Sequence, residues 1–235
     1  MGFVFIGGLQ ELTLTDFPDK VACIVFLVNC NFKCKFCYNK ELTSTSFFKK
    51  SKRKLIPDND FFLFLDSKKK MLDGVVITGG EPTLSPGLVE FVKKIKQKGF
   101  LVKLDTNGSN PVVLEKLLKK NLVDYVAMDL KSPEKKHKFI TQSSVPFSKI
   151  KESIFILKNS GVLHEFRTTL YPRLSIEDLK EMSELIVGER WFLQQFVGKN
   201  VLDKNSRHLR AFNNKKLEKI LKELNKITKV SVRGY

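Results

Sequence analysis

The sequence alternates short apolar runs with longer amphipathic stretches, and this alternation constrains the fold more than any other feature. The runs are mostly rich in β-branched or aromatic residues, which is typical of buried parallel strands. Six strands are expected, at residues 21–28, 74–78, 100–104, 125–128, 165–170 and 191–196. Strand–helix units in series predict an α/β fold with right-handed crossovers. We therefore expect a partial (β/α)6 barrel of parallel strands, short of the eight units of a complete barrel.

The stretches between these runs predict helices. They cover residues 57–71, 86–98, 111–120, 148–159, 176–187 and 215–226. Gly99 and Gly161 follow two of them, as glycine often does at the C-terminal end of a helix. Residues 7–19 are expected to form an extension before the first strand, and residues 230–232 a terminal strand.

The length of 235 residues suits one well-buried domain. We expect a single domain over residues 1–235, with an N-terminal extension (1–20), a core (21–197) and a C-terminal helix and tail (198–235).

The charge and hydropathy of the chain limit the partners and the cellular location that we expect for it. The net charge is +17, and its densest run is KKSKRK at residues 49–54, but most lysines are spread over expected helix surfaces. Scattered charge of this kind is typical of a solvated surface, so nucleic acid is not an expected partner. No apolar stretch reaches the ~18 residues of a membrane span, and the first ten residues lack a basic leader. We therefore expect a cytoplasmic protein with no membrane partner.

Three of the four cysteines lie within eight residues, directly after the first expected strand: Cys30, Cys34 and Cys37. In a reducing compartment, clustered thiols more often hold metal or do redox work than form disulfides. Zinc sites usually have four protein ligands, and only three cluster here. Three thiolates suit a [4Fe–4S] cluster with one iron left open. Cys23 lies inside the strand and is expected to be a small buried hydrophobic residue.

Other distinctive segments also fall where expected strands end. They are TGGEP (78–82), DTNG (105–108), MDLK (128–131), FRTT (166–169) and LQQF (193–196). Each taken alone could be a turn or a strand end with a structural role. In barrel-type folds, however, the chemistry gathers at the C-terminal ends of the strands. The repetition therefore favours a functional site.

The stretch CNFKCKFCYN resembles the CxxxCxΦC motif of radical S-adenosylmethionine (SAM) enzymes, with Phe36 at the aromatic position. The resemblance implies that Cys30, Cys34 and Cys37 ligate three irons of a [4Fe–4S] cluster. The fourth iron would bind the amino and carboxylate groups of SAM. One electron would then cleave SAM to methionine and a 5′-deoxyadenosyl radical, with no side chain needed as a general base.

The same resemblance implies a set of SAM-binding residues. The implied set is Phe36, Tyr38, Gly79, Gly80, Glu81, Asp105, Asp129, Lys131, Thr168 and Gln194. The GGE segment matches the edge that binds the methionine amino group, and the two aromatic residues would lie against adenine. The residues matching Asp105 and Asp129 help to hold a monovalent cation near SAM. The residue matching Lys131 contacts the SAM carboxylate or ribose, and the last two residues are looser candidates for the adenosine edge.

Segments across residues 7–197 resemble the activating proteins of anaerobic ribonucleoside-triphosphate reductase. This resemblance implies an activase that takes a hydrogen atom from one glycine of a glycyl-radical enzyme. The implied partners are that reductase and an electron donor such as flavodoxin or ferredoxin. Two positions depart from the family, because Tyr38 stands where His is frequent and Asp19 where Gly is common. Both departures leave the identity of the glycyl-radical partner open.

Three alternatives remain at this point. A radical SAM enzyme could act on a small molecule of deazapurine type. The net charge of +17 leaves room for a radical SAM enzyme that modifies RNA. A non-enzymatic zinc-binding module would contain zinc and no iron.

Overall fold

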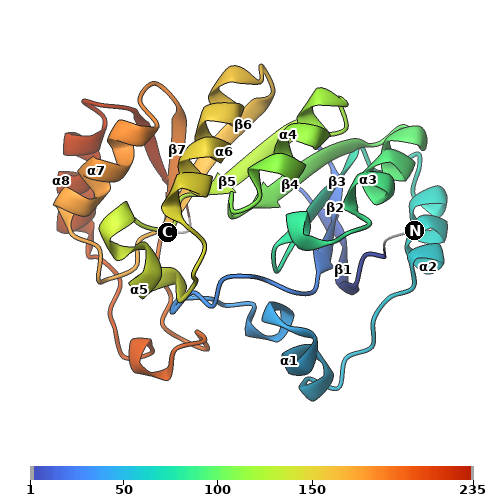
Figure 1. The fold of residues 1–235 in the computed structure, drawn as a ribbon, viewed down its shortest axis with the longest axis horizontal. Helices are drawn as coiled ribbons and strands as arrows, with labels where there is room; N and C mark the ends of the chain where they lie inside the picture. The colour runs from blue at the N-terminus through green and yellow to red at the C-terminus, as the bar shows by residue number, and fades with distance from the viewer. Residues whose placement is uncertain (1–2, 234–235) are drawn as a thin grey trace. The chain divides into compact units, whose positions relative to one another are not determined.

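The computed structural model describes residues 3–233, which form two compact units (Figure 1). Unit 1 comprises the described residues within 1–31, 41–106 and 112–126. Unit 2 comprises those within 32–40, 107–111 and 127–235. The single domain expected over residues 1–235, with its extension, core and tail, stays a prediction.

The eight strands follow one another in sequence order across one open sheet, from β1 to β8. β2 (Ala22–Leu27), β3 (Gly74–Gly79) and β4 (Leu101–Thr106) pair in parallel. β6 (Leu163–Thr169), β7 (Arg190–Gln194) and β8 (Lys229–Arg233) also pair in parallel. β5 (Tyr125–Asp129) lies between the two sets in strand order. The predicted α/β fold built on parallel strands is confirmed.

Unit 1 packs amphipathic helices against strands that are mostly buried, although the middle of β1 is exposed. Its helices are α1 (Thr45–Lys50), α2 (Asp58–Ser67), α3 (Leu88–Gln97) and most of α4 (Pro111–Lys119). α3 buries Leu88, Phe91, Val92 and Ile95. These positions recur at i, i+3, i+4 and i+7, which places them on one face of the helix. The apolar stripe therefore explains why this segment forms a helix and which face it turns to the sheet.

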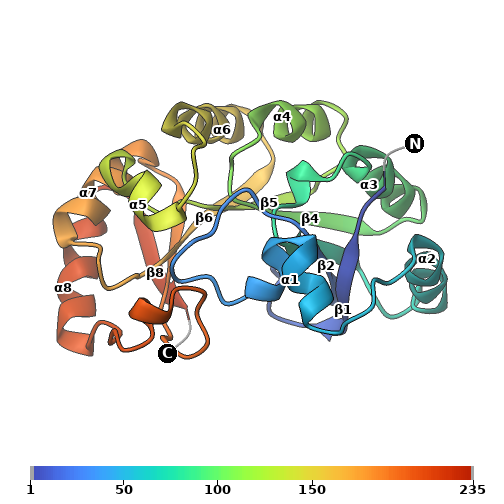
Figure 2. The ribbon, with the colours of Figure 1, turned by 60° about the horizontal axis from the view of Figure 1, so that its bottom comes forward.

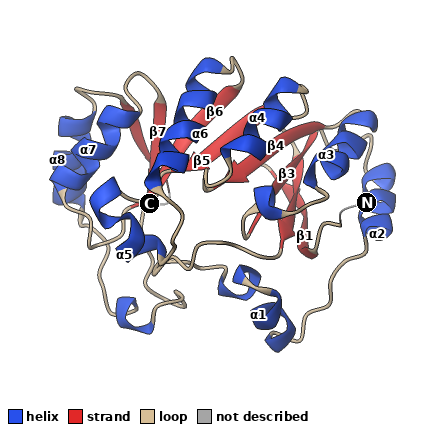
Figure 3. Cartoon of the chain, in the orientation of Figure 1, coloured by secondary structure: helices blue, strands red, loops and turns tan. Residues whose placement is uncertain are grey.

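Unit 2 combines the C-terminal strands with a second set of helices. They are α5 (His137–Thr141), α6 (Phe147–Asn159), α7 (Ile176–Leu185) and α8 (Asn214–Leu224). α7 begins at a capping box, in which Ser175 and Asp178 each accept a hydrogen bond from the other's backbone N–H. α7 and α8 lie side by side (Figures 1 and 3). β8 is tied to β6 by Arg233, whose two terminal nitrogens donate to the buried Glu165 carboxylate at 2.8 and 2.9 Å.

Residues 7–19 are not a strandless extension, and this corrects the sequence-based expectation. They contain most of β1 (Ile6–Thr13), which pairs antiparallel with β2. Gly7 and Gly8 lower strand propensity, which hides this strand in the sequence. A Cβ on Gly7 would lie 2.6 Å from the Val28 side chain and 2.9 Å from Phe48, so its lack of a side chain serves packing. Phe48 belongs to α1, which lies beside the end of β2 (Figure 2).

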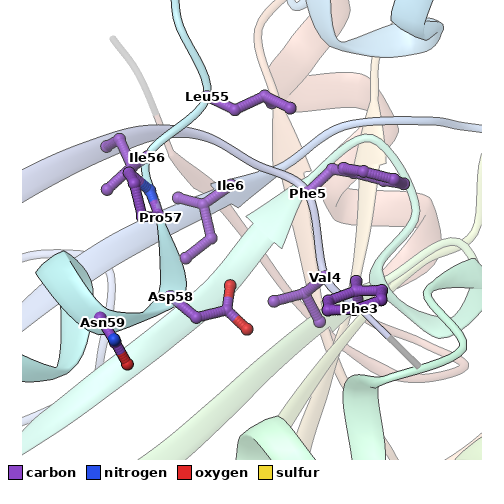
Figure 4. Close-up of a pocket in the computed structure, with 9 residues that line it drawn as sticks. All are labelled: Phe3, Val4, Phe5, Ile6, Leu55, Ile56, Pro57, Asp58 and Asn59. Carbon is purple, nitrogen blue, oxygen red and sulfur yellow. The ribbon is translucent and has the colours of Figure 1, made fainter. Parts of the chain in front are cut away.

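A cavity of about 410 Å³ opens in unit 1 beside the start of β1. Residues 3–6 and 55–59 line it, and the Asp58 carboxylate is its charged group (Figure 4). Burial raises the pKa of Asp58, and the positive charge of Lys94 offsets part of that rise. None of the residues that the sequence assigns to a site lines this cavity.

Within residues 3–233, no helix has the length and apolar character needed to cross a membrane.

Candidate active site

The loop that carries the cysteines begins at the end of β2, and its first part is held within unit 1. Asn29 has a φ of 88°, and its backbone N–H donates to the Leu42 carbonyl at 2.8 Å. Cys30 N–H donates to the Thr43 carbonyl at 3.0 Å. The acceptors lie in the short 3₁₀ helix η1 (Lys40–Thr43), which follows the cysteine loop. The backbone at Cys30 is therefore fixed from the far end of its own loop.

The GGE segment at the end of β3 presses against this same backbone. Gly80 N–H donates to the Leu27 carbonyl at 2.8 Å, and Glu81 N–H donates to the Asn29 carbonyl at 2.7 Å. A Cβ on Gly79 or Gly80 would lie less than 3.0 Å from backbone atoms of Leu27 or Asn29. Gly79 also has a φ of 117°, which favours glycine. Packing and backbone conformation therefore require glycine at these two positions, apart from any role of the segment in binding SAM.

Glu81 is buried and acts as the hydrogen-bond acceptor of the turn. Its Oε1 accepts from the Thr83 backbone N–H at 3.1 Å, from Thr83 Oγ1 at 2.6 Å and from Thr106 Oγ1 at 2.7 Å. Thr106 ends β4, so this carboxylate ties the turn after β3 to the next strand. These contacts give Glu81 a structural role, which is to fix the turn.

Asp105 is ion-paired with a lysine that the sequence analysis did not single out. Lys103 Nζ lies 2.6 Å from Asp105 Oδ1, and only 2% of the lysine side chain is exposed. The ammonium also lies 5.9 Å from the ring centroid of Tyr125. The only available signal was a lysine flanked by apolar residues in the segment LVKLDT.

The second part of the cysteine loop is held within unit 2. Lys33 N–H donates to the Thr141 carbonyl at the end of α5 at 2.8 Å, and Leu202 N–H donates to the Cys37 carbonyl at 2.9 Å. Cys37 N–H donates to the Cys34 carbonyl at 2.9 Å, which closes a turn between these two cysteines. Contacts from two distant segments therefore give this part of the loop a defined shape.

Asp129 and Lys131 follow β5 and form a charged group with Arg167 from β6. Asp129 Oδ1 accepts from Arg167 Nε at 3.0 Å, and Oδ2 accepts from Lys131 Nζ at 3.1 Å. Burial raises the pKa of Asp129, but the charges of Arg167 and Lys131 outweigh burial and lower it to about 2. Arg167 was missed in the sequence, although it belongs to the FRTT segment that was singled out.

Lys131 links this charged group to the cysteine loop. Its ammonium lies 5.7 Å from the ring centroid of Phe36. Burial lowers the pKa of Lys131, but the negative charges of Asp129, Cys34 and Cys37 outweigh burial and raise it. Unit 2 thus brings together Cys34, Cys37, the aromatic residue of the motif and two residues of the MDLK segment.

The two aromatic residues of the motif differ in burial. Phe36 is buried and packs on Tyr171 with ring centroids 5.5 Å apart. Tyr38 is 42% exposed, and its hydroxyl accepts a hydrogen bond from Val197 N–H at 2.7 Å. Both residues therefore have structural partners in unit 2.

The two looser candidates lie at the ends of β6 and β7. Thr168 is buried, and its hydroxyl donates to the Leu130 carbonyl at 2.5 Å and accepts from Trp191 Nε1 at 2.9 Å. Both roles of this hydroxyl are therefore engaged with the protein. Gln194 is half-buried, and its backbone carbonyl accepts a hydrogen bond from Leu170 N–H at 2.8 Å.

The donor set of the cysteine loop fits an iron–sulfur cluster. All four cysteines lie in the described part of the chain, and none forms a disulfide. Cys34 and Cys37 lie near a lysine ammonium, which favours the thiolate form that binds iron. Cys23 differs, because burial inside β2 raises the pKa of its thiol to about 12. Among residues 3–233, no group of three or more His, Cys, Asp or Glu side chains is arranged to hold a single metal ion.

Comparisons with known proteins bear on this site. The sequence profile of the Radical SAM superfamily matches residues 24–186. A Methanocaldococcus jannaschii protein, named as a candidate glycyl-radical enzyme activating enzyme, is 33% identical over 231 residues, 95% of this chain and 91% of its own. The pyruvate formate-lyase-activating enzyme of Listeria monocytogenes is 29% identical over 151 residues, 60% of this chain and 59% of that enzyme.

A solved structure supports the fold. Streptococcus suis SuiB bound to S-adenosylmethionine superposes with a TM-score of 0.62 and 15% identity, over 88% of this chain and 48% of SuiB. At this identity the likeness shows the fold alone. The profile covers more than half of the chain, and the Methanocaldococcus relative matches nearly all of it. The chain therefore belongs to the radical SAM superfamily, which implies a [4Fe–4S] cluster and SAM as cofactors, and it is an enzyme homologous to glycyl-radical enzyme activating enzymes.

Proposed function

We propose that this enzyme is a glycyl-radical enzyme activase whose partner is an anaerobic ribonucleoside-triphosphate reductase. The observation that carries the activase proposal is the 33% identity, over 95% of the chain, to a relative with that name. The shorter match to a pyruvate formate-lyase-activating enzyme supports the same class. The choice of reductase rests on the likeness of the segments across residues 7–197.

In this proposal Cys30, Cys34 and Cys37 are the three protein ligands of the cluster. The bound cluster and SAM supply the chemistry, which is reductive cleavage of SAM to methionine and a 5′-deoxyadenosyl radical. The protein supplies position. Hydrogen bonds from both units fix the backbone on either side of the cysteines, so the thiols start from a defined loop.

Lys131 is proposed to bind the SAM carboxylate or ribose. The Lys131 ammonium donates a hydrogen bond to Asp129 Oδ2 at 3.1 Å, which restricts the lysine side chain. Little further conformational freedom is therefore lost when it binds an anionic group. The turn at Gly79 and Gly80 is proposed to present its backbone to the methionine amino group, with Glu81 fixing the turn. The hydrogen bonds that Glu81 accepts from Thr83 and Thr106 keep the turn rigid.

The adenosine side is proposed to lie on unit 2. Phe36 offers a buried ring, and Tyr38 offers a partly exposed ring whose hydroxyl is anchored. Gln194 is the candidate for the adenosine edge. We assign Thr168 to support of the strand end, because its hydroxyl already binds Leu130 and Trp191.

The electron is proposed to come from a flavodoxin or a ferredoxin. The monovalent cation expected beside Asp105 and Asp129 is not carried into this proposal, because each carboxylate is ion-paired with cationic side chains.

The test is anaerobic electron paramagnetic resonance on iron-reconstituted protein mixed with reductant, SAM and an anaerobic ribonucleotide reductase. A parallel assay measures 5′-deoxyadenosine. We expect a glycyl-radical doublet that disappears when the radical glycine of the reductase is replaced by alanine. If 5′-deoxyadenosine forms without a doublet, the reductase is the wrong partner, and the search moves to other glycyl-radical enzymes, small molecules and RNA. If no 5′-deoxyadenosine forms, the proposed chemistry itself fails.

A further inference from the structure

Asp105 already has a cation of its own, supplied by the same strand. Lys103 and Asp105 both belong to β4, and Lys103 Nζ lies 2.6 Å from Asp105 Oδ1. The lysine side chain is 2% exposed and the aspartate 12%. An ammonium at this depth has lost most of its water, and an ionised partner must compensate for that loss. The pair is therefore a fixed part of unit 1. Solvent does not compete for it as it does for an exposed ion pair.

Asp129 is likewise compensated, within unit 2. Its two oxygens accept from different cations, Oδ1 from Arg167 and Oδ2 from Lys131. Arg167 is always protonated, and the pKa of Lys131 is raised, so both are positive at neutral pH. Unit 2 thus places two positive charges on this one carboxylate.

The charges of these groups disfavour an additional free cation. Within unit 1 the Asp105 carboxylate is paired with Lys103, and within unit 2 the Asp129 carboxylate is paired with Lys131 and Arg167. A sodium or potassium ion that approached Asp105 would meet the ammonium already seated on Oδ1. Like charges at contact distance repel strongly where water is excluded. The residues do not fit the monovalent cation that the family resemblance implied.

We infer that Lys103 is a built-in cation that makes SAM binding by this enzyme independent of monovalent metal ions. The inference rests on the proposed function, because the family resemblance is what implies that SAM binds near Asp105. Lys103 acts as a positioning residue: it holds the Asp105 carboxylate and supplies the positive charge that an ion from solution would otherwise supply.

The first experiment measures SAM affinity by calorimetry on reconstituted, anaerobic wild-type protein. Buffers contain potassium, sodium or tetramethylammonium chloride at equal ionic strength. We expect the three dissociation constants to agree within about twofold. A difference of that size is too small for coupling between a cation site and the SAM site. A wild-type protein that binds SAM about tenfold more weakly in tetramethylammonium would overturn the inference.

The second experiment replaces the built-in cation. Lys103→Met keeps a long unbranched side chain and removes the charge, so Asp105 is left to attract an ion from solution. We expect this variant to bind SAM about tenfold more tightly in potassium than in tetramethylammonium. Lys103→Met/Asp105→Asn removes both charges and should not gain that dependence. If Lys103→Met shows no ion dependence, Lys103 does not replace an ion and the inference is wrong.

Lys96→Met is the matched control. Lys96 Nζ lies 2.7 Å from both oxygens of Asp124 in the same unit, so this variant also breaks a lysine–aspartate pair. No ion dependence is expected there.

A readout without SAM separates failure of this inference from failure of the proposed function. An ion that binds only the folded state raises the unfolding temperature by mass action. Potassium should therefore raise the unfolding temperature of Lys103→Met above its value in tetramethylammonium, and leave the wild type unchanged. This comparison decides the inference through the melting temperatures even if no variant binds SAM. A protein that shows the melting pattern and binds no SAM would refute only the proposed function. Should Lys103→Met fail to fold, a potassium-dependent shift of the wild type is the result that overturns the inference.

Discussion

Cys23 and Cys34 are both buried thiols, one in a strand and one in the loop that follows it. Cys23 lies inside β2 and pairs in register with Val75 of β3. Burial among apolar strands raises its pKa to about 12, so it stays protonated. Cys34 is 5% exposed, yet it lies in the field of the Lys131 ammonium. Burial alone therefore makes a thiol inert, whereas burial beside a fixed cation favours the thiolate that binds metal.

The largest expected effect comes from replacing each of these two cysteines with alanine, which removes the thiol. Cys34→Ala should lose the cluster and reduce 5′-deoxyadenosine formation to the level without protein, because one of three iron ligands is gone. Cys23→Ala should keep both, since its thiol only packs. Iron and sulfide per chain, together with 5′-deoxyadenosine, measure the outcome. Equal loss in the two variants would break the comparison and the ligand assignment with it.

The second prediction concerns how the loop is held. Gly80→Ala places a Cβ less than 3.0 Å from the Asn29 backbone and 2.9 Å from the Leu42 carbonyl oxygen. Because backbone cannot yield as a flexible side chain can, we expect a loss of about 3 kcal/mol in unfolding free energy. Chemical denaturation of the metal-free protein measures it.

Gly8→Ala is the matched control. Its nearest neighbour would be the Phe26 side chain at 3.6 Å, an ordinary contact, so we expect a change within about 0.5 kcal/mol. Similar losses in both variants would show that the close approach of Gly80 to Asn29 is not what constrains the loop.

The parts of the fold with strong periodicity could be predicted from the sequence. β2 and β3 are continuous apolar runs that end within one residue of their expected bounds. β1 and α1 could not be predicted in this way. In β1 two glycines lower strand propensity, and α1 begins TSFF after two more polar residues. Tertiary contacts override local preference in both: Phe48 of α1 packs with Val28 and Leu42, and β1 pairs with β2.

The candidate site divides in the same manner. The cysteines could be found because three of them lie within eight residues, and the MDLK segment because distinctive segments recur where expected strands end. Lys103 and Arg167 could not, because a lone lysine or arginine in a strand gives no sign of which carboxylate it will meet. Their roles come from register and strand order, which bring residues distant in sequence onto one carboxylate, such as Arg167 onto Asp129.

The third prediction tests the support beneath Lys131 through its pH dependence. The pKa of Asp129 is lowered to about 2, so the unfolded state binds its proton more readily than the folded state. Its contribution is therefore complete above the unfolded pKa of about 3.9 and is lost as pH falls through about 2. The side chain is 27% exposed, so we expect about 2 kcal/mol of unfolding free energy to disappear across this window.

Denaturation of metal-free wild type and Asp129→Asn between pH 6 and pH 2.5 measures this effect as a shrinking difference. Asp66→Asn is the control, because its pair with Lys98 is 53% exposed on the aspartate side and such pairs contribute little. A pH-independent difference between wild type and Asp129→Asn would mean that the charges of Lys131 and Arg167 do not act on this carboxylate.

The smallest expected effect tests the comparison of thiols directly, with Lys131→Met in the metal-free, reduced protein. Removing the ammonium lowers the thiolate fraction at Cys34 and Cys37, while the remaining thiolate becomes a better nucleophile, so the two changes partly cancel. We expect alkylation of these two cysteines to slow by about threefold near neutral pH. Peptide mass spectrometry against time resolves each site, with Cys23 unreactive throughout. Lys135→Met, which removes an exposed lysine of unit 2, should leave every rate unchanged. If Lys131→Met alkylates at the wild-type rate, the field of this lysine is not what separates the loop thiols from Cys23, and burial and access alone must explain the difference.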